Sequence, residues 1–111
     1  MNTVLSEILE TGVTTTASGN DTIRVHSSIS LSEGRFLQRI IKELDPTISL
    51  EVGLAYGISA LFICDALIAR NGTKHIVIDP NQHGGPWGRF LGWNWHRKSL
   101  SCGIWGYCTP H

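Results

Sequence analysis

The stretch from Leu50 to Ser59 constrains the fold of this chain more than any other part of it. It reads Leu-Glu-Val-Gly-Leu-Ala-Tyr-Gly-Ile-Ser, so an apolar run leads into two glycines and then into further apolar residues. This order predicts a buried strand, a glycine turn and a helix. About twenty residues later, a second apolar run, 75–78, ends in Asp79. A strand, a glycine turn, a helix and a second strand ending in an acid form the layout of a nucleotide-cofactor site.

The elements around this turn predict an α/β fold. Strands are expected at 48–52 and 74–79, with an almost wholly apolar helix at 57–70 between them and a left-handed cap at Asn71-Gly72. Strands joined through a helix should be parallel, with a right-handed crossover. Both strands are nearly continuous apolar runs, which suits a sheet that is covered on both faces.

A second helix is predicted before the first strand. Ser30 and Glu33 fit a capping box, and Asp45-Pro46 should end the helix. Its apolar stripe, expected to pack on the sheet, consists of Phe36, Leu37, Ile40, Ile41 and Leu44.

The first residues carry weaker signals. Val4, Leu5, Ile8 and Leu9 have helical spacing ahead of Gly12. Residues 14–20 are rich in turn formers and are expected to form a mobile loop. Residues 22–26 alternate, which fits either a short strand or an extended connector.

Composition narrows the class of protein. The 111 residues suit one small domain, and the formal net charge of zero does not suggest a nucleic-acid partner. No apolar run of about 18 residues is present, so no membrane span or membrane partner is expected. The first residues do not resemble a secretory signal, and Cys64 fits a buried free thiol. We therefore expect a reduced, cytoplasmic protein.

The residues of the turn suggest how a ligand would be held. Gly53 and Gly57 let the backbone approach a ligand, and the helix start at Gly57 with the Ser59 hydroxyl favours a negative group. Asp79 can accept two hydrogen bonds from a ribose diol, and Glu51 needs a partner such as a cationic amine or backbone N–H groups. Each feature alone has an ordinary structural explanation: a glycine turn, a helix cap or a turn-starting Asp-Pro. The pattern is neither G-x-G-x-x-G nor a Walker loop.

Residues 50–59 resemble motif I of class I S-adenosylmethionine-dependent methyltransferases, and especially the catechol O-methyltransferase-like group, whose motif reads E-[IVL]-G-x-x-x-G-x-S. Residues 75–80 resemble the following strand with its ribose-binding acid, and 32–37 resemble the helix start that precedes motif I. The likeness covers about 29–82. One departure is Ala55, which stands at the middle glycine of the commoner E-x-G-x-G-x-G form.

The resemblance implies the N-terminal half of a Rossmann-like, doubly wound methyltransferase domain with an incomplete sheet. It implies S-adenosylmethionine as cofactor and a small molecule that accepts methyl on oxygen, or on nitrogen. Ser59 would contact the methionine carboxylate, Glu51 would lie near the amine, and Asp79 would bind the ribose. The cofactor-binding residues it implies are Glu51, Gly53, Ala55, Tyr56, Gly57, Ser59 and Asp79.

The tail departs from this pattern. No Asp or Glu follows Asp79, and all four tryptophans lie after Gln82, so the chain ends after about two strands of the expected sheet. We expect a frameshift between Gln82 and Trp93, or a truncation. Because tryptophan has a single codon, Trp93 to His96 read from the second codon base gives Gly-(Ile/Thr)-Gly-(Ile/Thr), which resembles the next helix of the same family. Read from the third base, the same codons give Glu-Leu-Ala, which is also typical of a helix, so the choice between the two shifted frames stays open. The alternative is a genuine, lineage-specific C-terminus.

The chain is thus expected to divide into a poorly defined leader (1–28), a partial cofactor-binding unit (29–82) and an irregular tail (83–111). No metal is expected, because the spacings of the candidate zinc ligands fit no standard pattern. These candidates are His96, Cys102, Cys108 and His111. The tail's Trp and basic residues are poor support for single-strand binding.

Function is expected to be that of a methyltransferase, present as a truncated and inactive fragment. Two alternatives stay open: a non-enzymatic remnant that binds no cofactor, and a fragment of a nicotinamide-dependent oxidoreductase. No catalytic residue is assigned, since His26 and His83 fit solvated loop positions. The oligomeric state and the identity of the methyl acceptor are left open.

Overall fold

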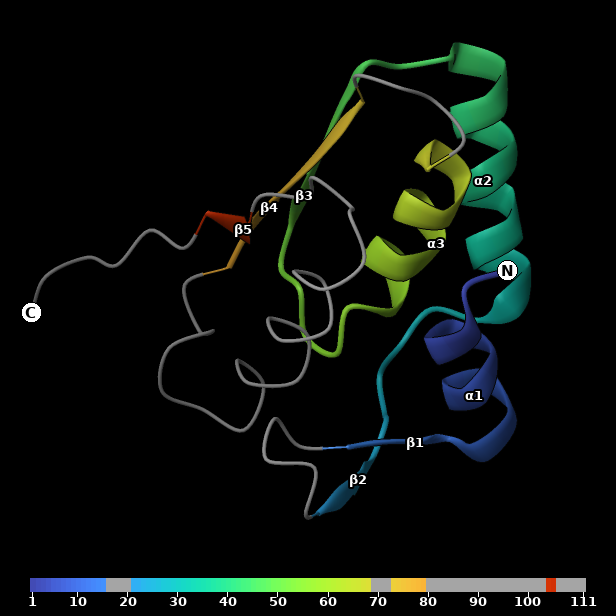
Figure 1. The fold of residues 1–111 in the computed structure, drawn as a ribbon, viewed down its shortest axis with the longest axis vertical. Coiled ribbons are helices and arrows are strands. Elements are labelled where there is room, and N and C mark those ends of the chain that lie inside the picture. The colour runs from blue at the N-terminus through green and yellow to red at the C-terminus, as the bar shows by residue number, and fades with distance from the viewer. Residues whose placement is uncertain (16–20, 69–72, 80–103, 106–111) are drawn as a thin grey trace, which may run out of the picture.

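A parallel pair of strands joined through a helix forms the centre of the protein (Figure 1). The computed structural model describes residues 1–15, 21–68, 73–79 and 104–105. Within them, β3 (Ile48–Val52) pairs in parallel with β4 (Lys74–Ile78), and α3 (Ile58–Leu67) connects the two. The predicted parallel βαβ unit is therefore confirmed. The rest of the predicted helix beyond Ile68 and its Asn71-Gly72 cap lie outside the described residues.

The sheet has one strand more than the sequence predicted. β5 (Ile104–Trp105) pairs in parallel with β4, so the strand order is β3-β4-β5. The expectation of only about two strands was wrong here, because a two-residue strand in a glycine-rich segment leaves no periodic signal. The remaining tail residues, including His83 and the four candidate zinc ligands, lie outside the described residues.

The helix before β3 begins and ends as predicted. In α2 (Leu31–Leu44) the Ser30 hydroxyl accepts from the Glu33 N–H at 3.3 Å, and Glu33 Oε2 accepts from the Ser30 N–H at 2.7 Å. These hydrogen bonds favour the ionised Glu33 carboxylate and lower its pKa. The helix ends where Asp45 takes a left-handed conformation.

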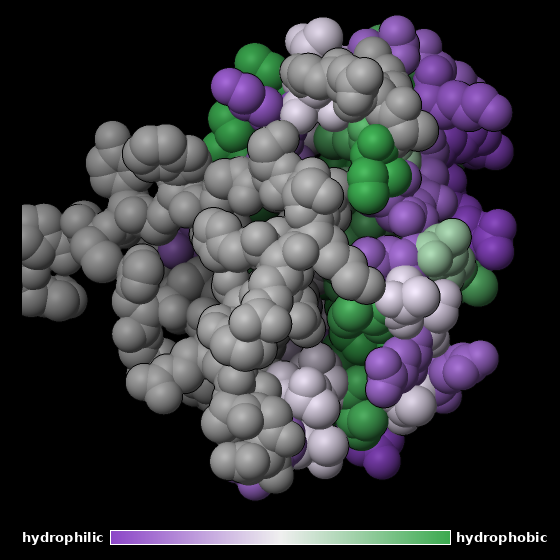
Figure 2. Space-filling model, viewed as in Figure 1, coloured by the Kyte–Doolittle hydropathy of each residue, from purple (hydrophilic) through white to green (hydrophobic). Residues whose placement is uncertain are grey.

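The buried face of α2 differs from the predicted apolar stripe. Gly34 is buried against the Phe62 ring of α3, and the Gln38 side chain donates to the Phe62 carbonyl at 3.0 Å. Phe36 and Leu44 are exposed instead of packed, and the Arg39 guanidinium lies over the Phe36 ring. A side chain at Gly34 would overlap the Phe62 ring, so α2 and α3 can pack together at this position only because it is glycine. Hydrophilic residues cover the outer side of the molecule where α2 lies (Figure 2).

The N-terminal segment forms a helix and a hairpin. α1 (Thr3–Thr11) confirms the predicted helix and ends at left-handed Gly12, and its Leu5 and Ile8 are buried in the core. β1 (Val13–Thr15) pairs antiparallel with β2 (Thr22–Arg24). Thr14 and Thr15 are thus in a strand, not in the predicted loop, because cross-strand pairing overrides their turn preference. Residues 16–20 lie outside the described residues.

One face of the sheet is covered, and the other is exposed along β3, whereas Ile76 and Ile78 of β4 are half-buried on it. α3 packs on the face that carries Ser49 and Glu51, whereas Ile48, Leu50 and Val52 on the opposite face are 61%, 61% and 76% exposed. The prediction of a sheet covered on both faces was therefore wrong. In a doubly wound sheet, the helices on the second face follow strands beyond the switch point. The described residues contain no such helix.

Candidate cofactor-binding site

The turn after β3 has an alternating left-handed backbone. Gly53, Ala55 and Gly57 have φ angles of 86°, 46° and 76°. The Gly53 N–H donates to the Ile78 carbonyl at 2.8 Å, which fixes the start of the turn to the end of β4. A Cβ on Gly53 would meet no atom of the described residues within 4 Å, so the backbone conformation, and not crowding by these residues, requires glycine there. The described residues therefore leave open space beside the backbone at Gly53.

Replacing Ala55 with glycine is expected to stabilise the protein. A left-handed conformation costs a non-glycine residue about 1–2 kcal/mol, of which the greater freedom of glycine in the unfolded chain offsets part. We expect Ala55→Gly to raise the free energy of unfolding by about 1 kcal/mol in urea titrations. Ala66→Gly, inside α3, is the matched control and should lower it by about 1 kcal/mol. A loss of stability in Ala55→Gly would contradict the left-handed geometry.

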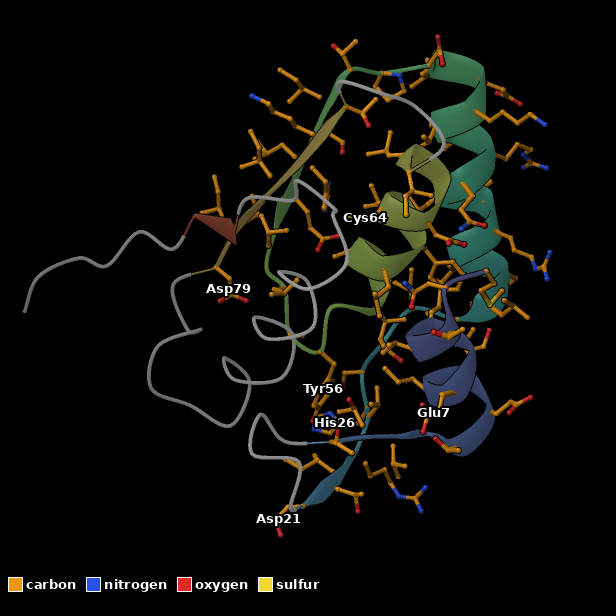
Figure 3. All side chains as sticks on the ribbon, viewed as in Figure 1. Glu7, Asp21, His26, Tyr56, Cys64 and Asp79 are labelled. Atoms are coloured by element: carbon orange, nitrogen blue, oxygen red, sulfur yellow. The ribbon has the colours of Figure 1, made fainter. Side chains whose placement is uncertain are left out.

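Asp79 binds the turn from the end of β4 (Figure 3). Its carboxylate is 6% exposed and accepts the Leu54 N–H at 2.7 Å and, more weakly, the Ala55 N–H at 3.4 Å. These two N–H groups come from the turn itself, so one carboxylate joins the ends of both strands. Asp79 therefore has a structural role in shaping the turn as well as a position at the ends of the strands.

Glu51 and Ser59 are brought together between β3 and α3. The Ser59 hydroxyl lies close enough to the Glu51 carboxylate to affect its pKa, while Glu51 Oε1 is buried with no hydrogen-bond partner among the described residues. Burial raises the pKa of Glu51, and the Ser59 hydroxyl opposes this rise. Ser59 is not the helix cap, because the N-cap of α3 is Gly57, which makes no side-chain hydrogen bond. In the part of the chain that the structure describes, no side chain therefore caps the first N–H groups of α3, which favours an anionic group nearby.

Tyr56 points away from the open side of the turn. Its side chain is 5% exposed and belongs to the core cluster that includes Leu5 and Ile8. The His26 ring meets it edge-on, with ring centroids 5.5 Å apart and an interplanar angle of 82° (Figure 3). Any ligand contact at Tyr56 would therefore come from its backbone. From the sequence, His26 was predicted to be a solvated loop residue. No sequence pattern connects His26 with Tyr56, which lies thirty residues later in the chain.

Five of the seven predicted site residues form the turn and the helix start, and Glu51 and Asp79 flank them from the two strands. All of them lie at the carboxyl end of the parallel strands, where open α/β sheets bind ligands. Within the described residues, no three His, Cys, Asp or Glu side chains gather as a metal site would require. None of the described helices combines the length and apolar character needed to cross a bilayer.

Comparison with known proteins places the fold. No protein-family model and no curated protein matches the chain. Its structure is similar to an O-methyltransferase from Bacillus cereus, crystallised in complex with SAH, with a TM-score of 0.50 and 22% sequence identity. The match covers 70% of this chain and 31% of that enzyme, so the chain spans less than a third of the enzyme's length. The chain therefore has the Rossmann-like α/β fold of class I methyltransferases, with an incomplete sheet in its described residues.

Proposed function

We propose that the turn between β3 and α3 binds S-adenosylmethionine, as part of a methyltransferase that acts on an oxygen of a small molecule. The observation that carries this proposal is the left-handed turn held between Glu51 and Asp79 at the ends of two adjacent parallel strands. The SAH in the similar Bacillus cereus enzyme supports the choice of cofactor. A nucleoside with an amino-acid arm suits such a site, because its ribose diol, ammonium group and carboxylate could each meet a complementary group of the protein.

Each charged or polar part of the cofactor has a candidate partner. The unpartnered Glu51 Oε1 suits the ammonium group, which would also compensate the cost of burying this carboxylate. The start of α3, with the Ser59 hydroxyl, suits the carboxylate. Asp79 suits the ribose diol, since a carboxylate accepts several hydrogen bonds and can bind a diol while it holds the turn.

The chain is proposed to be an inactive form of such an enzyme, with a tail altered by a frameshift. Methyl transfer requires the acceptor to be oriented and its proton removed. The described residues offer the cofactor turn but no assigned group for that step. Resequencing the coding DNA from Gln82 onward tests the frameshift. A shifted frame that stays open and encodes alternating strands and helices supports it, and early stops in both shifted frames contradict it.

Calorimetry separates the proposed cofactor from the alternatives. S-adenosylhomocysteine (SAH) and NAD both carry a ribose that Asp79 could bind, but only SAH carries the amino-acid arm that Glu51 and Ser59 suit. We expect SAH to bind and NAD to bind more weakly. Binding of NAD in preference would favour an oxidoreductase fragment. Binding of neither would favour a remnant without cofactor and would contradict the proposal.

Removing the charge of Glu51 is expected to affect stability and binding in opposite directions. The folded-state pKa of Glu51 lies above its ordinary value of 4.5, so its protonated form favours folding. That stabilisation is full below the ordinary pKa and is lost as pH rises through the folded-state pKa. Glu51→Gln should therefore make the unliganded protein more stable at neutral pH, as measured in urea.

The same change should weaken SAH binding, because the glutamine amide carries no negative charge to pair with an ammonium group. In the unchanged protein, SAH affinity should rise with pH as Glu51 ionises, and in E51Q this dependence should disappear. Glu43→Gln, an exposed change on α2, is the matched control. Equal SAH affinity and an equal pH profile in E51Q would contradict the role proposed for Glu51.

A further inference from the structure

Two buried side-chain atoms on the covered face of the sheet lack hydrogen-bond partners. In the described part of the chain these are Glu51 Oε1 and His75 Nε2. The His75 side chain is 1% exposed, although imidazole is polar. An unsatisfied buried polar atom costs about 1–3 kcal/mol, so two of them on one face require an explanation.

The strand register brings the two side chains to neighbouring positions. Ser49 pairs with His75, and Glu51 pairs with Val77, so Glu51 and His75 share a face and are diagonal neighbours. From a strand spacing of about 4.8 Å and a rise of about 3.3 Å per residue, their Cβ atoms are about 8 Å apart. The two unpartnered atoms do not bond each other directly, but both side chains are long, so one bridging water can join them.

Ser49 is the hydrogen-bond partner of one nitrogen of the His75 ring. The Ser49 hydroxyl lies 2.8 Å from His75 Nδ1. Burial lowers the pKa of His75, which favours the neutral ring with a single N–H. If the hydroxyl donates to Nδ1, the ring proton is on Nε2. The unpartnered nitrogen is then a donor, and the unpartnered Glu51 oxygen is an acceptor.

We propose that His75 is a positioning residue for Glu51, with its Nε2–H donating to one water that in turn donates to Glu51 Oε1. This water-mediated contact would favour the ionised carboxylate against the effect of burial and direct it toward a cationic ligand group. The consequence for ligand binding rests on the proposed function, but the hydrogen bond itself does not. The hydroxyl of Ser49 then affects Glu51 indirectly, by favouring the His75 tautomer that carries its proton on Nε2.

Other titratable groups near β3 have interactions of their own or lie on the opposite face of the sheet from Glu51. Asp65 lies 3.9 Å from the N-terminal amine, and the Asp79 carboxylate accepts from the turn. Lys74 is exposed and pairs with Ile48 on the opposite face. Among the described residues, the elements packed against β3 also carry Cys64, buried on α3, and Tyr56, buried in the turn.

NMR titration of the Glu51 side-chain carboxyl carbon tests the proposal on the full chain, with E51Q identifying the signal. In His75→Leu, the Glu51 pKa should rise by about one pH unit, because the ionised form loses a donor. His75→Gln keeps an N–H donor and should leave the Glu51 pKa near its original value. Val77→Ala is the matched control, since it trims the residue that pairs with Glu51 without removing a donor.

The outcomes are distinct. An unchanged Glu51 titration in H75L, or equal rises in H75L and H75Q, would overturn the proposal. If H75L does not fold, Ser49→Ala serves instead: it frees the tautomer and should raise the Glu51 pKa by less. SAH calorimetry against pH provides the second readout, with the profile of H75L displaced to higher pH. If the unchanged protein binds no SAH, the proposed function fails while the Glu51 titration still decides the role of His75.

Discussion

Phe62→Ala is expected to lower the free energy of unfolding by about 3–5 kcal/mol, which is the cost of emptying a fully buried aromatic site. Phe62 is 0% exposed and lies between α3 and α2, where its ring fills the space beside Gly34. A domain of this size has a small reserve of stability, so the variant should be largely unfolded by far-UV circular dichroism. Phe36→Ala is the matched control, because Phe36 is half-exposed on α2, and it should cost far less.

Substitutions at Gly34 test the same contact between α2 and α3 from the other helix. A Cβ at Gly34 would overlap the Phe62 ring, so Gly34→Ala alone should cost about 1–3 kcal/mol despite the higher helix propensity of alanine. In the Phe62→Ala background the ring is gone, and the same change should become neutral or stabilising by up to about 1 kcal/mol. The double-mutant cycle measures this reversal of sign, with all four proteins in a stabilising osmolyte that keeps the Phe62→Ala variants folded. Additive effects would show that α2 and α3 do not meet at these residues.

Asp79→Ala is expected to affect both stability and ligand binding. Without the carboxylate, the buried Leu54 N–H loses its acceptor, which should lower the free energy of unfolding by about 1–3 kcal/mol. Any ribose-dependent binding should weaken by about 1–3 kcal/mol as well, measured by SAH calorimetry at a temperature where the variant is folded.

Asp79→Asn separates the two roles. The amide oxygen can still accept from Leu54, so this variant should keep most of the stability that Asp79→Ala loses. It cannot offer two acceptor oxygens to both the turn and a ribose, so SAH binding should still weaken. If Asp79→Asn binds SAH as tightly as the unchanged protein, Asp79 serves only the turn, and the role proposed for it in binding ribose fails.

Local features of this fold could be read from the sequence because they depend on residues close together in the chain. The Ser30–Glu33 capping box joins residues three apart, and the left-handed Gly57 follows from its own lack of a side chain. The parallel strands β3 and β4 were predictable because a ten-residue helix joins them. The same applies to the candidate site, whose residues come mostly from one short segment.

Tertiary structure alone decided which side chains meet. Gly34 and Gln38 contact Phe62 because the ring fits against α2 only where the helix lacks a side chain. The face of α2 that packs on α3 is therefore the one with Gly34, and Phe36 is exposed. Tyr56 is buried in the same core cluster as Leu5 and Ile8 of α1, with its ring against His26, and no local pattern in the sequence predicts this.

The sequence by itself determined the strand, turn, helix and second strand, and with them the position of Glu51 and Asp79 at the strand ends. The structure decided that Asp79 holds the turn and that His75 lies buried beside Ser49. The reason is physical: backbone conformation is set by neighbouring residues, whereas these two contacts join segments about 25 residues apart that only packing brings together.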